Sequence, residues 1–156
     1  FNVNLVIEHG TDGYKVAPEL ALAEVPVVHG PWLKVRGNFE QSGRNADAPR
    51  ILIENKVLTA FSTDHPVIPI QNLRMQAMTA VEQGVTPAAA LKAVTFSPAQ
   101  IMGIHNRVGS LEKGKDADVV ILSGLPFEAG TRVNPTLVNG KLCWQRESEK
   151  VAAFNQ

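Results

Sequence analysis

The sequence has a single cysteine, Cys143, few aromatic residues and no excess of charge of either sign. One cysteine excludes an intramolecular disulfide framework, and it favours a reducing, cytoplasmic location. Lys and Arg number 15, as do Asp and Glu, so nothing indicates binding to nucleic acid or to an acidic membrane surface. Every apolar run falls short of the roughly 20 residues that cross a membrane, so we expect a soluble protein.

What the sequence contains is typical of a globular protein. Its 156 residues are 44% hydrophobic, which is enough chain and enough apolar side chain to bury a core. The first residues, FNVNLVIEHG, include no Met, no basic segment and no small-residue cleavage site. We therefore expect the chain to start inside a longer polypeptide.

Strand and helix patterns alternate through residues 1–106. Short runs rich in β-branched residues predict strands at 3–7, 26–29 and 57–62. A helical pattern follows each strand, which predicts parallel β/α units. Three such units would leave two unpaired strand edges, so self-association into a homo-oligomer is expected.

The helices between and after these strands have recognisable starts. Thr86-Pro87 and Ser97-Pro98 each match an N-cap followed by Pro in the first turn, and together they predict a compact helical corner. The remaining helices are expected at residues 14–23, 47–55 and 71–83, with a long polar loop at 34–47.

The pattern changes after residue 106, because no helix separates the later strands. Strands are expected at 108–111, 118–122, 132–138 and 141–145, the last two joined by Asn139-Gly140 in a type I′ turn. Cys143 alternates with apolar neighbours and is expected to be buried or half-buried. The predicted division is an α/β part at 1–106, a small antiparallel β unit at 107–146 and a polar tail at 147–156.

Imidazole and carboxylate side chains follow the predicted strands where each one ends. His9 follows the first strand, His29 ends the second, and Asp64 and His65 follow the third. A neutral imidazole and a carboxylate suit zinc or a similar divalent ion. The alternatives stay open on these residues alone, because His9 could be a polar strand end and Asp64 could cap the turn before Pro66.

Four segments together resemble a known family. They are LVIEHGTDG (5–13), STDHPVIP (62–69), FSPAQIMGIHNRVGSLEKGKDADVVIL (96–122) and VNGK (138–141). This combination resembles the C-terminal part of the metal-dependent amidohydrolases, in the imidazolonepropionase-like and prolidase-like branch. The most specific piece is GSLEKGKDADVVIL (109–122).

The resemblance implies an α/β fold of a particular kind. In that family an eight-stranded TIM-type (β/α) barrel carries its active site at the carboxyl ends of the strands, and a complete barrel takes about 250 residues. The segments at 3–7, 26–29 and 57–62 resemble the sixth, seventh and eighth strands. Residues 107–146 resemble part of the family's small β-sandwich.

The resemblance also implies roles for individual residues. His9 matches a metal ligand, and Asp64 matches a metal ligand that also handles the proton of the attacking water. The cofactor implied is a divalent metal, zinc above all, as one or two ions, which would lower the pKa of water to about 7. His29, His65 and Tyr14 lie near the same rim and are candidate substrate contacts.

Other ligands of the family are missing from this sequence. It contains no His-x-His pair, and two ligands fall short of the three or four that zinc requires. The expected function is therefore metal-dependent hydrolysis of C–N bonds in a cyclic amide or dipeptide-like substrate, with this chain as a C-terminal part. The alternatives are an inactive self-associating fragment, a subunit completed by a second chain, and a dihydroorotase- or hydantoinase-like cyclic amidase.

Overall fold

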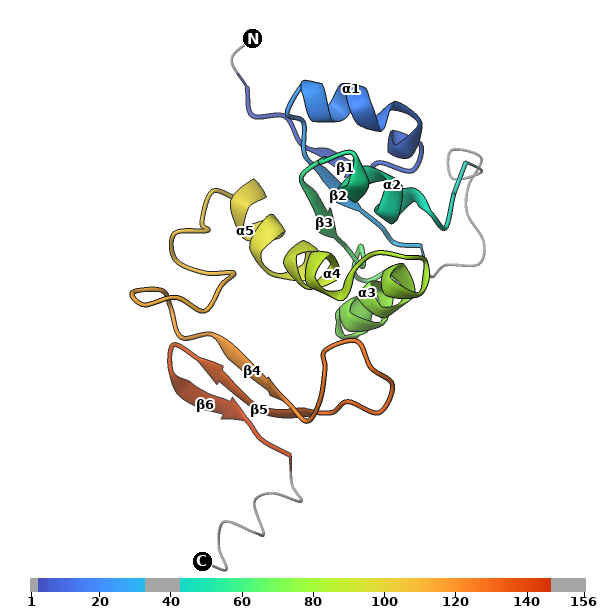
Figure 1. Cartoon of the computed structure of the whole chain (residues 1–156). Helices are drawn as coiled ribbons and strands as arrows, with labels where there is room; N and C mark the ends of the chain where they lie inside the picture. Colours follow the sequence, from blue (N-terminus) through green and yellow to red (C-terminus); the bar gives the residue numbers. More distant parts are fainter. Residues whose placement is uncertain (1–2, 33–42, 147–156) are drawn as a thin grey trace, which may run out of the picture.

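A computed structural model describes residues 3–32 and 43–146 of the chain. It is a mixed α/β structure in which a parallel sheet with its helices is followed by an antiparallel sheet (Figure 1). The predicted tail at 147–156 and most of the predicted loop at 34–47 lie outside the described residues.

The parallel sheet consists of three short strands in the order β1-β2-β3. They are β1 (Ile7–His9), β2 (Val27–His29) and β3 (Thr59–Phe61). The last residues of the strands, His9, His29 and Phe61, are aligned across the sheet. The first predicted strand was placed too early, because residues 3–6 are exposed and only the end of the β-branched run pairs with β2.

Helices cover β2 on one side through a small apolar cluster. A 3-10 helix at Gly13–Val16 leads into α1 (Ala17–Leu22), and α2 (Ala48–Glu54) follows β2. The cluster is made of Ala17, Val27, Leu52 and Val57, each 5% exposed or less. Its members come from α1, β2, α2 and the segment before β3, so this contact fixes the first two β/α units against each other.

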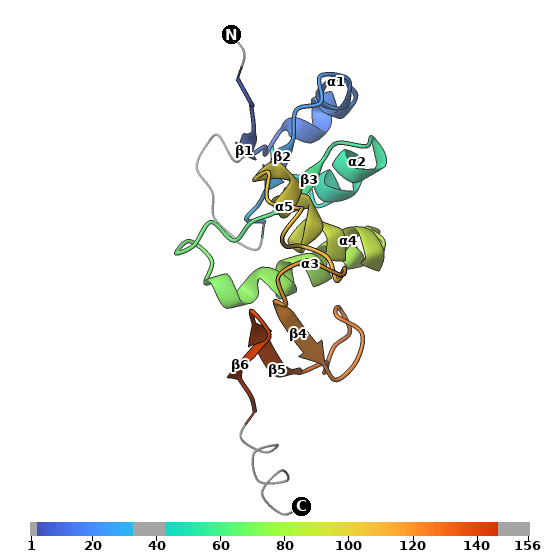
Figure 2. The same ribbon diagram turned by 90° about the vertical axis from the view of Figure 1, so that its left-hand side faces the viewer.

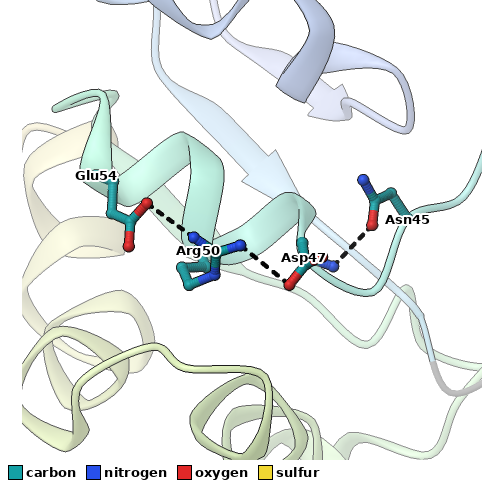
Figure 3. Close-up of polar contacts among 4 residues, drawn as sticks. All are labelled: Asn45, Asp47, Arg50 and Glu54. Carbon is teal, nitrogen blue, oxygen red and sulfur yellow. Dashed lines mark hydrogen bonds and ion pairs between the residues drawn. The ribbon is translucent and has the colours of Figure 1, made fainter.

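Side chains also organise the start of α2. Asn45 accepts a hydrogen bond from the backbone N–H of Asp47 at 2.9 Å, and Arg50 bridges Asp47 and Glu54 at 3.2 and 3.0 Å (Figure 3). The charged groups are largely exposed, so the ion pairs add little to stability. Asp47 is the expected first residue before the helix, although its side chain makes no capping bond.

Three further helices follow β3 and contact it. A 3-10 turn at Ile70–Asn72 leads into α3 (Leu73–Glu82), which is followed by α4 (Pro87–Val94) and α5 (Phe96–Ile101). The core shared by β3, α3 and α4 consists of Phe61, Ala77, Ala80, Val85, Ala90 and Ala93. Small alanines at these positions let the helices approach Phe61 closely.

One predicted helix start is confirmed and the other is wrong. The hydroxyl of Thr86 accepts a hydrogen bond from Ala89 N–H at 3.2 Å, as an N-cap does. Ser97 does not cap α5, because the helix has already begun at Phe96 and Ser97 is buried within it.

The antiparallel sheet lies beyond α3 and α4, at the end of the molecule opposite the N-terminus in both views (Figures 1 and 2). Its strands are β4 (Val119–Leu122), β5 (Val133–Val138) and β6 (Lys141–Trp144). Val138 pairs with Lys141, and Asn139 and Gly140 have φ of +50° and +72°. This confirms the predicted type I′ hairpin.

Two predictions for this region are wrong. Residues 108–110 form a bend rather than a strand and residue 111 has no regular structure, because Gly109 has φ +91° and packs against Ala99 and the backbone of α5. Cys143 is exposed, since β6 is an edge strand and all of its residues are open to solvent. Within the described ranges, no helix is long and apolar enough to cross a membrane.

Candidate functional site

The carboxyl ends of the three parallel strands bring the predicted site residues to one edge of the sheet. His9 and His29 are the last residues of β1 and β2 and lie in register, and Asp64 follows the end of β3 by a few residues. His9 and Asp64 both have left-handed backbone conformations, with φ of +65° and +50°. Non-glycine residues seldom adopt such φ values, and they gather at functional sites.

The His9 imidazole has a defined orientation. Its Nδ1 lies 2.7 Å from the carbonyl oxygen of Gly30. Because a carbonyl can only accept, Nδ1 carries the hydrogen and Nε2 is left as a lone-pair donor. This is the arrangement of most metal-binding histidines, in which a backbone carbonyl fixes the tautomer and the ring orientation.

The His29 imidazole is likewise held by a backbone carbonyl, that of His9 on the neighbouring strand. Its Nδ1–H donates to the backbone carbonyl of His9 at 2.9 Å, and its ring stacks on Trp32 at 5.4 Å between centroids. Only 6% of the residue is exposed, and this burial lowers the pKa of His29 to about 4. The imidazole is therefore neutral at physiological pH.

Asp64 lies in a tight turn that begins where β3 ends. Its backbone N–H donates to the hydroxyl of Ser62 at 3.0 Å, and its carbonyl accepts from Val67 N–H at 2.7 Å. Ser62 in turn donates its N–H to the carbonyl of His29 at 2.9 Å, which ties this turn to β2. Asp64 is half-buried, whereas the adjacent His65 is exposed.

Tyr14 belongs to the 3-10 helix after β1 and is half-buried. Its hydroxyl donates to the carbonyl of Gly43 at 3.3 Å, so it binds the segment that leads into α2. His105 is exposed and contacts Phe96 edge-on, in line with a surface position in the helical corner.

Metal-binding side chains do not form a complete cluster within the part of the chain that is described. No group of three His, Cys, Asp or Glu residues there lies close enough together to hold an ion. The individual donors nevertheless suit a metal, because the Nδ1 bond of His9 leaves Nε2 as a possible ligand and Asp64 is a carboxylate that follows β3 at the same edge of the sheet.

A pocket of about 810 Å³ lies elsewhere, between the helical corner and β4. Its lining is mostly apolar and includes Leu91, Phe96, Val108 and Val120, but none of the predicted site residues. The acidic and basic side chains beside it serve the fold. Examples are Arg107 with Asp116 at 2.7 Å and the Asp118 carboxylate, which accepts the N–H of Asn139 at 2.8 Å.

Three residues of the site were not predicted from the sequence: Gly30, Trp32 and Gln76. Gly30 and Trp32 lie within three residues of His29, and they contact His9 and Gln76, which are distant in the sequence. Gln76 could have been noticed, because it occupies an apolar helical face with Leu73, Ala77 and Ala80 at the spacing of one buried stripe. A polar residue in such a stripe indicates a buried hydrogen-bonding role.

The sequence matches the model of the Amidohydrolase family over residues 3–143. The chain belongs to the amidohydrolase family. The resemblance carried by the four sequence segments is therefore confirmed, and the family's members include hydrolases of C–N bonds.

Two relatives and one solved structure show which amidohydrolases this chain resembles. It is 35% identical to imidazolonepropionase from Desulfotalea psychrophila over 52% of this chain and 22% of the relative. It is 36% identical to N-acetylglucosamine-6-phosphate deacetylase from Bos taurus over 43% of this chain and 15% of the relative. The crystal structure of an amidohydrolase from Thermotoga maritima superposes with a TM-score of 0.88 and 41% identity, over 92% of this chain and 37% of that chain. The chain thus spans well under half the length of each of these proteins.

Proposed function

We propose that β1, β2 and β3 are the sixth, seventh and eighth strands of a TIM-type (β/α)8 barrel. The parallel order and the alternation with helices support this assignment, as do the two outer strands, each of which has one unpaired edge. In this proposal residues 1–106 belong to the barrel, residues 107–146 to a small β-sandwich and residues 147–156 to a tail.

The activity we propose is hydrolysis of a C–N bond in a small cyclic amide or dipeptide-like substrate. It is supported by family membership and by the names of relatives, which include a deacetylase and an imidazolonepropionase. The observation that carries the proposal is the hydrogen bond from His9 Nδ1 to Gly30, because it leaves Nε2 of His9 as a possible ligand at the carboxyl end of β1, the edge of the sheet at which the Asp64 turn follows β3. We place the protein in the cytoplasm.

His9 and Asp64 are the residues of this chain that would hold a divalent metal, zinc above all, as part of a centre with one or two ions. Such an ion supplies Lewis acidity, which lowers the pKa of water to about 7. Because the described residues hold no third ligand nearby, the other donors would come from additional polypeptide.

In this proposal each of these side chains has its own role in the reaction. The Asp64 carboxylate takes a proton from the attacking water and passes it to the leaving nitrogen. His29, neutral and aligned with His9, would contact the substrate as a hydrogen-bonding group. His65 and Tyr14 are further candidate substrate contacts, although the Tyr14 hydroxyl already donates to Gly43.

The test is a chimera in which this chain replaces the matching segment of the Thermotoga maritima amidohydrolase, to which it is 41% identical. We expect zinc uptake and hydrolysis of at least one cyclic amide or Xaa-Pro dipeptide. His9→Ala should lower the zinc content, and Asp64→Asn should lower kcat by about 10²- to 10⁴-fold.

His105→Ala serves as the matched control, because it removes an exposed histidine of the same chain. It should leave both zinc content and kcat unchanged. A folded chimera that binds zinc equally well with and without His9, or whose kcat is unaffected by Asp64→Asn, would refute the assignment.

A second candidate function is supported by the exposed apolar surface of the antiparallel sheet. Val120, Ile121, Leu142 and Trp144 are between 45% and 58% exposed, and both sheets have unpaired edge strands. Surfaces of this kind favour association. The chain would then act as a self-associating, non-catalytic unit, and sedimentation across a range of concentrations tests this by comparing the measured mass with 16.9 kDa.

A further inference from the structure

Gln76 is a fully buried polar residue in α3, with 0% of its surface exposed. Both ends of its side-chain amide are bonded. The Oε1 atom accepts the backbone N–H of Trp32 at 3.0 Å, and Nε2 donates to the backbone carbonyl of Ser62 at 2.5 Å. Because Trp32 N–H can only donate and the Ser62 carbonyl can only accept, the partners fix which end is oxygen and which is nitrogen.

Packing alone does not account for a glutamine here. Its neighbours on the same helical face are Leu73, Ala77 and Ala80, so an apolar side chain of similar size would continue the stripe. Burying an amide is unfavourable unless both ends find hydrogen-bond partners. The two partners of Gln76 lie in different loops, which gives the amide a role in holding those loops together.

Both loops lead directly to the candidate site. Ser62 receives the N–H of Asp64 on its hydroxyl and donates its own N–H to the carbonyl of His29. Trp32 stacks on the ring of His29. A single side chain from α3 therefore anchors the turn that carries Asp64 and the residue that packs against His29.

We propose that Gln76 is a positioning residue that fixes the Asp64 turn relative to the end of β2. It acts through the Ser62 carbonyl and the Trp32 amide, and it touches none of the reacting groups. The catalytic meaning of this role rests on the proposed function, whereas the positioning itself is a property of the chain.

The test uses the ¹⁵N-labelled full chain and the variant Gln76→Met, which keeps the length of the side chain and removes both hydrogen bonds. We expect the Trp32 amide to exchange with solvent about tenfold faster, the effect of losing one buried hydrogen bond. The amide resonances of Asp64 and His29 should shift as well. The control Leu52→Val destabilises the other apolar cluster and should leave those two resonances in place.

Unchanged Asp64 and His29 resonances in Gln76→Met, or equal shifts in Leu52→Val, would overturn the inference. Should Gln76→Met fail to fold, the wild-type chain decides the matter. Its Gln76 side-chain amide protons should exchange far more slowly than those of the exposed Gln83, and equal rates would overturn the inference.

Measuring the activity of the chimera tests whether this positioning matters for catalysis. In the chimera, Gln76→Met should lower kcat by about 10- to 100-fold, because it displaces Asp64 without removing its carboxylate. An unaffected kcat would contradict a catalytic role for the positioning. An inactive unsubstituted chimera would refute the proposed function instead, and the resonance shifts would still decide the role of Gln76.

Discussion

Replacing Gly30 with alanine should be one of the most damaging small substitutions in this chain. A Cβ on Gly30 would lie 2.2 Å from the carbonyl oxygen of Ser62, far inside contact distance, and the obstacle is backbone that cannot rotate away. The φ of Gly30 is +131°, a value that L-residues rarely adopt. The same residue accepts the His9 hydrogen bond, so any displacement also reaches the candidate site.

The size of the effect follows from two contributions. Holding alanine in this backbone region costs about 1–3 kcal/mol, and forcing a methyl group against packed backbone costs about 1–3 kcal/mol more. We therefore expect Gly30→Ala to lower the free energy of unfolding by about 4 kcal/mol. A loss of that size is a large fraction of the stability of an ordinary domain.

Urea unfolding followed by far-UV circular dichroism measures this loss, with Gly103→Ala as the control. Gly103 also has a positive φ, of +71°, but a Cβ at this residue would have no heavy atom within 4 Å. It should lose only about 1–2 kcal/mol, the backbone contribution alone. Equal losses in the two variants would show that the close approach of Gly30 to Ser62 does not exist in solution.

Three other outcomes are expected. Lowering the pH from 7 to 4 should lower the free energy of unfolding by about 3 kcal/mol through His29. The His29 imidazole takes up a proton below about pH 6.5 in the unfolded state but only near pH 4 in the folded state, so acid favours the unfolded state. His29→Asn should remove that part of the pH dependence in urea titrations, and an unaltered dependence would contradict it. Thr86→Ala should lower the free energy of unfolding by about 1 kcal/mol through loss of the N-cap, whereas Thr79→Ala, which removes only a bond to the Met75 carbonyl within the same helix, should have a smaller effect. Cys143 should react with a thiol reagent in the native protein as fast as in urea, and a slow native reaction would contradict its exposure.

The parts of the fold that follow from short-range pattern could be predicted from the sequence. Thr86-Pro87 determines a helix start and Asn139-Gly140 determines a hairpin through backbone preferences that act over a few residues. The start of β1 at Ile7 and the start of α5 at Phe96 could not be predicted in this way. Strand pairing begins only where β2 offers a partner, and α5, which begins directly after Thr95, packs against α4 and β3.

In the candidate site, too, some features could be predicted from the sequence and others could not. His9, His29 and Asp64 could be found because each follows a strand pattern, and parallel strands bring their carboxyl ends to one edge. The orientation of His9 could not, because its partner is the carbonyl of Gly30, and backbone carbonyls carry no sequence signal. Gln76 could have been noticed as a polar residue in an apolar stripe, but its partners could not be predicted, since both are backbone atoms of distant loops.

The hydrogen bonds of His9 and His29 make the ends of β1 and β2 interdependent. The His29 ring is bonded to the backbone of His9, while the His9 ring is bonded to the backbone of Gly30, next to His29. Loss of either ring removes a restraint on the other residue. The effects of replacing both should therefore add up to less than the sum of the single effects, so the two positions are expected to tolerate change more readily as a pair than one at a time.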